Sequence, residues 1–130
     1  LADLAGLARR EPILAFLMLL FVLSLLGIPP LAGFWAKLYV FRAAVEAGRV
    51  GLAVAVALNS AVAVAYYYGI LRAMYVAPAP AGRAETGVAA GGAMQIGLAL
   101  AAAGVLVLGF FPEMFIGWVT AAAGLAGLAP

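Results

Sequence analysis

The sequence predicts an all-α integral membrane protein with three transmembrane helices, the first of them discontinuous at Pro29-Pro30. Three observations predict this fold class: the composition, the length and that pair of prolines. Of the 130 residues, 68% are hydrophobic and 9% are charged, whereas a soluble domain has about 25% charged residues. So apolar a chain lacks the polar surface that a soluble fold exposes to water. At about 20 residues per crossing, it accommodates three or four transmembrane helices.

The first predicted crossing, residues 12–46, follows a cytoplasmic lead-in segment at residues 1–11 that contains Arg9 and Arg10. Pro12 suits the first turn of a helix, because the N–H that it lacks has no partner there. Prolines further along a helix remove backbone donors and push the preceding residue out of the helical conformation. We therefore expect the helix to break and then resume, at a segment marked by Gly27, Pro29, Pro30 and Gly33.

Two further crossings are predicted at residues 50–76 and 93–112. The segment between them, residues 77–92, is rich in proline, alanine and glycine and is predicted to be a cytoplasmic loop. Glycines weaken any helix in residues 113–130. We therefore expect a C-terminal tail on the membrane surface there, and a short fourth crossing is the alternative.

The distribution of arginine orients the chain in the membrane. If residues 12–46 form a single interrupted crossing, Arg9, Arg10, Arg72 and Arg83 lie on one side. The positive-inside rule places that side in the cytoplasm. The alternative treats the double proline as a hairpin turn and gives four crossings. It separates Arg72 and Arg83 from Arg9 and Arg10, which is a poorer charge distribution.

The residue types that are missing exclude several kinds of chemistry. The sequence has no cysteine and no histidine, which excludes disulfides, thiolate metal ligands, iron–sulfur ligation and the usual haem ligand within this chain. The five acidic residues are scattered, so no metal site is expected, and a net charge of +2 is too small to indicate nucleic acid as a partner. Any proton carried by this chain would have to move through lysine, arginine, glutamate, tyrosine or water.

Lys37 is the candidate catalytic residue, as a proton relay. A lysine at the centre of a lipid-facing helix costs about 2.5–3.5 kcal/mol, and a broken helix is tolerated only where protein or a cavity satisfies its backbone groups. Both features occur in the ion and substrate sites of transporters. If the second half-helix starts near residues 31–33, Lys37 lies one to two turns inside it. The positive end of that half-helix and burial then both favour release of its proton. The alternative is a lysine that extends to the headgroups.

Three side chains of the second crossing form a possible polar path: Asn59, Ser60 and Tyr66. Asn59 and Tyr66 are seven residues apart and share one face of a helix, which is compatible with the wall of a hydrated path. The alternative is that these groups form hydrogen bonds between neighbouring helices.

The segment SLLGIPPLAGFWAKLY (residues 24–39), followed by Asn59-Ser60 and by tyrosines 66–68, resembles the antiporter-like membrane subunits of respiratory complex I. Those subunits contain two inverted repeats, each with a broken helix, and this segment is similar to the second break. The position of Lys37, where M-type subunits have glutamate, and the triple tyrosine make the chain most similar to the N-type subunits.

The resemblance implies a non-redox part of a proton-translocating NADH:quinone oxidoreductase, in the bacterial cytoplasmic membrane. Flavin, iron–sulfur clusters and quinone are then expected in other subunits, and the partners are other membrane-arm subunits, the lipid bilayer, protons and water. Lys37 would correspond to the broken-helix lysine on the path toward the outer side. The chain would form the C-terminal quarter to third of such a subunit. The alternatives are a subunit of an Mrp-type cation/proton antiporter and a purely structural membrane anchor.

Overall fold

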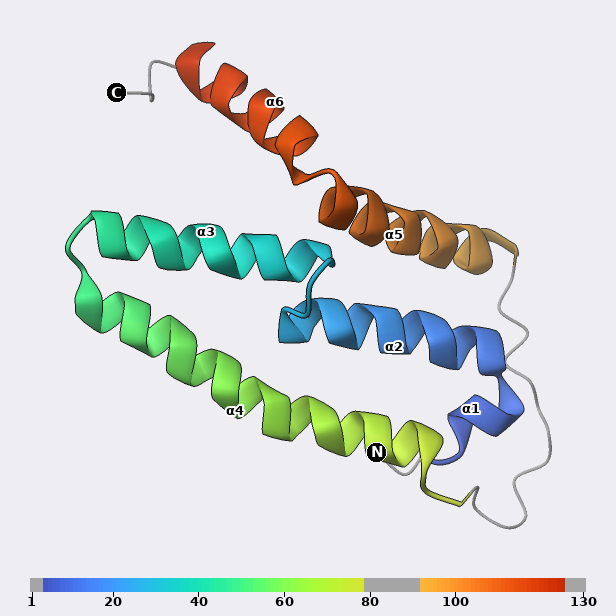
Figure 1. The fold of residues 1–130 in the computed structure, drawn as a ribbon. Coiled ribbons are helices and arrows are strands. Elements are labelled where there is room, and N and C mark those ends of the chain that lie inside the picture. Colours follow the sequence, from blue (N-terminus) through green and yellow to red (C-terminus); the bar gives the residue numbers. More distant parts are fainter. Residues whose placement is uncertain (1–3, 79–91, 126–130) are drawn as a thin grey trace.

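The computed structural model describes residues 4–78 and 92–125, and the regular elements in these ranges are helical (Figure 1). In chain order they are α1 (Leu7–Arg10), α2 (Pro12–Leu26), α3 (Ala32–Glu46), α4 (Val50–Tyr75), α5 (Gly92–Phe110) and α6 (Pro112–Leu125). The predicted loop at residues 77–92 falls mainly on residues 79–91, and the end of the predicted tail falls on residues 126–130. Both of these parts lie outside the described residues.

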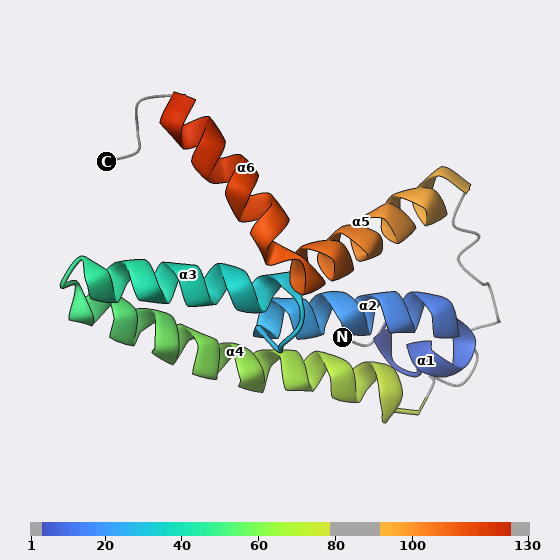
Figure 2. The same cartoon turned by 45° about the horizontal axis from the view of Figure 1, so that its top comes forward.

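The helices α2 and α3 run in the same direction, one after the other, as Figures 1 and 2 show. A hairpin at the two prolines would instead turn the chain back. The long helix α4 runs in the opposite direction along both of them, and α5 packs against α2 and α3 on their other side. The interrupted pair α2–α3 is therefore the middle layer of the fold, and its break faces the end of α5.

Helix length supports two of the three predicted crossings directly. Val50–Tyr75, with 26 residues, and Gly92–Phe110, with 19, are long and apolar enough to cross a membrane. The apolar helix α2 has 15 residues, which at 1.5 Å per residue is shorter than a hydrocarbon core of about 30 Å. A third crossing therefore requires α2 and α3 together.

The C-terminal part, where a surface tail of weak helix propensity was expected, contains a helix. Pro112 begins a new helix, α6, instead of closing the preceding one, and α5 ends at Phe110. Proline is favoured in the first turn of a helix, where its missing N–H has no partner to lose. Gly117 lies inside α6 with no atom near the position of an added Cβ. The glycines of this part thus lower its helix propensity without preventing a helix.

The end of the fold that holds α1 is closed by a small apolar cluster. Leu7, Ala15 and Met74 are buried together. The amide of Gly6 donates to Ala73 O at 3.2 Å, and the hydroxyl of Tyr75 donates to Ala15 O at 3.1 Å. These contacts fix the end of α4 against the start of α2. They lie at the opposite end of α2 from the break between α2 and α3.

Candidate functional site

The break between α2 and α3 is built around a left-handed glycine. Gly27 has φ +86° and follows the last residue of α2, and glycine adopts this conformation without the clash of a side chain. The amide of Gly27 donates to Ser24 O at 3.0 Å, and that of Ile28 donates to Leu23 O at 3.2 Å. This pattern is a Schellman motif, which satisfies two carbonyls at the end of α2. The carbonyl of Leu26 stays available for another donor.

Lys37 supplies that donor. Its Nζ lies 3.0 Å from Leu26 O, and its Cδ passes 3.1 Å from where a Cβ of Gly27 would be. The side chain is half-buried. Side chains of a helix lean toward its N-terminus, so a lysine in the second turn of α3 reaches back across the break to α2.

The position of this ammonium adds a contact that the sequence did not indicate. Lys37 lies one to two turns inside α3, as expected, and its Nζ contacts the C-terminal end of α2. A helix C-terminus carries a partial negative charge, which stabilises a cation. Among the described residues, no carboxylate lies within ion-pair distance of Lys37. The ion pair of these residues is elsewhere on α3 and joins Arg42 to Glu46.

Ser24 is the site residue that the sequence interpretation missed. It is the buried polar side chain among the described residues, with 7% of its surface exposed. Its Oγ accepts the amide N–H of Gly33, at 3.1 Å, and so caps the first turn of α3 from the last turn of α2. A Cβ on Gly33 would overlap the carbonyl of Ser24, which explains why this position requires glycine. A serine one turn before a break was the signal available in the sequence.

A second interruption of the chain lies against the first one. The indole N–H of Trp35 donates to Gly109 O at 2.8 Å, near the end of α5. A Cβ on Gly109 would overlap Pro30 O and lie 2.8 Å from Leu31 Cα. The last turn of α5 therefore packs directly on the backbone of the α2–α3 break.

Among the described residues, no hydrogen bond joins the three residues of the predicted polar path to Lys37. Asn59 and Tyr66 are exposed on α4, and 68% of the Tyr66 surface is accessible. The hydroxyl of Ser60 donates to Val56 O of its own helix at 2.9 Å. Their role in a proton path stays a prediction.

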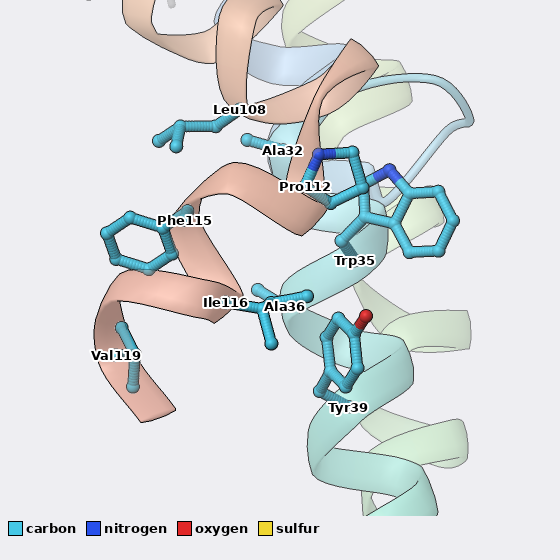
Figure 3. Close-up of a pocket in the computed structure, with 9 residues that line it drawn as sticks. All are labelled: Ala32, Trp35, Ala36, Tyr39, Leu108, Pro112, Phe115, Ile116 and Val119. Carbon is cyan, nitrogen blue, oxygen red and sulfur yellow. The ribbon is translucent and has the colours of Figure 1, made fainter. Parts of the chain in front are cut away.

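An apolar groove runs beside the two breaks, between α3 and the α5–α6 pair. Its volume is about 380 Å³. The wall from α3 includes Trp35 and Tyr39, and the opposite wall is formed mainly by α6 (Figure 3). In the described part of the chain, no three His, Cys, Asp or Glu side chains gather where they could bind a metal ion. The arrangement at the break thus offers one cation, several backbone carbonyls and an apolar surrounding.

Residues 1–63 match the family model described as "NADH:quinone oxidoreductase/Mrp antiporter, TM". The chain is 40% identical over 123 residues to NADH-quinone oxidoreductase subunit N of Myxococcus xanthus, covering 95% of this chain and 23% of that protein. It is 43% identical over 111 residues to F(420)H(2) dehydrogenase subunit N of Methanosarcina mazei, covering 85% and 22%.

A solved structure is similar as well. A chain of respiratory complex I from Thermus thermophilus with bound aureothin matches 86% of this chain and 25% of its own length, with 34% identity and a TM-score of 0.70. The chain thus spans about a quarter of the length of the relatives that it matches.

Proposed function

We propose a function from one premise: the chain belongs to the NADH:quinone oxidoreductase/Mrp antiporter transmembrane family. On that premise it is part of a proton-translocating membrane subunit of complex I, of the N type, which couples quinone reduction to proton pumping. Lys37 is its proton-carrying residue and lies on the path toward the outer side of the membrane. Proton transfer is the chemistry of this chain, and electron transfer belongs to other subunits.

The contact of Lys37 with the end of α2 is the observation that carries this proposal. An ammonium has three N–H donors, and the one contact in the described residues is to Leu26 O. Two donors are therefore left for water or for groups in the remainder of the subunit. A half-buried lysine held at a helix break by a single neutral acceptor has the exchangeable contacts that a proton relay needs.

The remaining assignments follow from the family and the sequence. We propose that α2 and α3 together form one interrupted crossing, that α4 and α5 form two more, and that the chain lies in a bacterial cytoplasmic membrane. With neither cysteine nor histidine in the sequence, flavin and iron–sulfur clusters are assigned to other subunits of the complex, together with quinone. The partners are those subunits, the surrounding lipid, water and protons.

The test replaces Lys37 in the full-length subunit of the assembled complex, reconstituted in liposomes. Lys37→Ala removes the ionisable group, and the proton transfer that depends on it is expected to slow by about a hundredfold or more. Lys37→Arg keeps the positive charge but gives a group that does not deprotonate in proteins, so it is expected to fail as well. The measurement is the number of protons translocated per electron transferred.

Arg42→Gln is the matched control, because Arg42 is an exposed cation on the same helix, α3. It is expected to leave proton translocation unchanged. Unchanged translocation in Lys37→Ala, with the complex intact, would instead support a structural anchor. If only Lys37→Arg behaved like the wild type, the lysine would act as a fixed charge and the relay would be excluded.

The family model also covers Mrp antiporters, so a cation/proton antiporter subunit is the second candidate. The two candidates differ in their partners. Purification of the native complex with flavin and iron–sulfur proteins would support the oxidoreductase. Purification without them, combined with sodium-dependent proton movement, would support the antiporter.

A further inference from the structure

The end of α5 has backbone carbonyls that its own helix leaves without donors. The amide of Phe111 donates to Val107 O at 2.9 Å. Pro112, the next residue, has no N–H, and it begins a new helix. The last carbonyls of a helix need partners from elsewhere, and in the membrane interior water is not available to supply them. Gly109 O is one of these carbonyls, and Trp35 is its partner.

Two separate contacts therefore meet at Gly109. Its carbonyl accepts the indole N–H of Trp35, and its α-carbon approaches the backbone of Pro30 and Leu31 so closely that a side chain has no room. Gly109 is buried. The end of α5 is thus located by a hydrogen bond and by close packing, both against the α2–α3 break.

Trp35 and Lys37 hold the start of α3 from two sides. They are two residues apart, which is roughly 200° around a helix of 3.6 residues per turn. Lys37 accordingly reaches the C-terminal end of α2, while Trp35 reaches the C-terminal end of α5. The first two turns of α3 lie between these two helix ends.

From this geometry we infer that Trp35 is a positioning residue for Lys37. The inference rests on the proposed role of Lys37 in proton transfer. The indole N–H fixes α3 against the end of α5, and this fixes the distance from Nζ of Lys37 to Leu26 O. Hydrogen bonds weaken steeply as their geometry departs from the optimum, so a displacement of α3 by about 1 Å is enough to lose that contact.

The test is Trp35→Phe in the full-length subunit of the assembled complex, since phenylalanine keeps an aromatic ring but has no N–H. Proton translocation per electron is measured across pH. We expect roughly a fivefold decrease in protons translocated per electron near neutral pH, the effect of one net hydrogen bond, together with a pH profile that differs from that of the wild type. A change in the contacts of the proton-carrying group alters how transfer depends on pH, whereas a purely structural loss lowers translocation equally at every pH.

Few other titrating groups lie on the helices around Lys37. The helices α2 and α5 contain no ionisable side chain, α4 contains Arg72 and tyrosines, and α3 itself contains Tyr39, Arg42 and Glu46. The matched control is Trp118→Phe, because Trp118 is 77% exposed on α6. In this variant, proton translocation per electron and its pH profile are expected to stay as in the wild type.

Two results would overturn the inference while leaving the proposed function in place. One is wild-type translocation in Trp35→Phe. The other is a decrease of equal size at every pH, since this indicates a purely structural role. If the complex with Trp35→Phe fails to assemble, benzothienylalanine at position 35 is used instead, because it replaces the indole N–H by sulfur and keeps the shape of the side chain. A wild-type pH profile in that variant would also contradict the inference. Failure of the proposed function is recognised separately, by normal translocation in Lys37→Ala.

Discussion

The two interruptions of this chain differ in how their backbone groups are satisfied. The first one covers residues 27–31, between α2 and α3, and the second consists of Phe111 alone, between α5 and α6. At the first, donors and acceptors come from its own flanking helices, through Ser24 and Lys37. At the second, the donor to Gly109 comes from a different segment, 74 residues away in sequence.

This difference makes one break dependent on the other. The first break closes on itself and carries a cation, whereas the second is completed by a side chain that the first break positions. Because free carbonyls in the membrane interior must be bonded within the protein, two breaks that lie against each other can share donors. A disturbance of either break is therefore expected to reach the other one.

The largest effects are expected from alanine at the two glycines that permit close backbone contact. Gly33→Ala and Gly109→Ala each place a Cβ on a backbone carbonyl, of Ser24 and Pro30 respectively. Overpacking of this kind destabilises by about 1–3 kcal/mol. We expect both variants to disturb both breaks, because Gly109 itself packs on Pro30 and Leu31 of the first one. The measurement is the thermal stability of the assembled complex.

Gly51→Ala and Gly104→Ala are the controls for these variants. Both glycines are helical, and an added Cβ would meet no atom within 4 Å. Alanine is favoured over glycine in a helix by about 1 kcal/mol, so both controls are expected to be neutral or slightly stabilising. A loss of stability in Gly33→Ala or Gly109→Ala no larger than in these controls would contradict the close backbone contact at that glycine.

A smaller effect is expected at the cap of α3. Ser24→Ala leaves the amide of Gly33 without its acceptor, and loss of a side-chain cap costs about 1 kcal/mol. Ser24→Thr keeps the hydroxyl and is expected to retain most of the stability. Ser60→Ala is the control, because that hydroxyl bonds within its own helix. If Ser24→Ala proved as stable as Ser60→Ala, the hydrogen bond across the break would contribute nothing.

The sequence was sufficient to predict the helical fold and the first break. The apolar composition excludes a soluble fold, and α2 ends at Leu26 and α3 begins at Ala32, on either side of the paired prolines. The second break was harder to predict. A single proline after an apolar run is compatible with both a helix end and a helix start. The glycines after Pro112 lower helix propensity, and residues 112–125 form a helix nonetheless.

The site was predictable only where a residue is unusual for its surroundings. Lys37 is conspicuous because a charge in an apolar segment requires a partner. Its partner is a backbone carbonyl, which every residue has, so the sequence held no signal for Leu26 O. Trp35 is hidden for the same reason, since its partner is the carbonyl of Gly109. Ser24 had only its place one turn before the break as a signal, and its role depends on the amide of Gly33 that lies opposite it in three dimensions.

The smallest effect on stability is expected from replacing Pro112, the proline of the second break. The expected effect is instead a change in the angle between α5 and α6. Pro112→Ala restores an N–H that can donate to Leu108 O, so α5 and α6 can approach a continuous helix. The expected result is a longer distance between spin labels at the exposed positions Leu100 and Val119. This distance is measured on introduced cysteines in a cysteine-free form of the full-length subunit.

Pro29→Ala is the matched variant at the first break, with labels at the exposed positions Phe16 and Val40. Here the distance is expected to stay unchanged, because Gly27 still ends α2 in the left-handed conformation and the contacts of Ser24 and Lys37 still join the two half-helices. An equal change in both pairs of labels would mean that each break depends on its proline alone. An unchanged distance in Pro112→Ala would mean that the contact of Trp35 with Gly109 holds the second break without the proline.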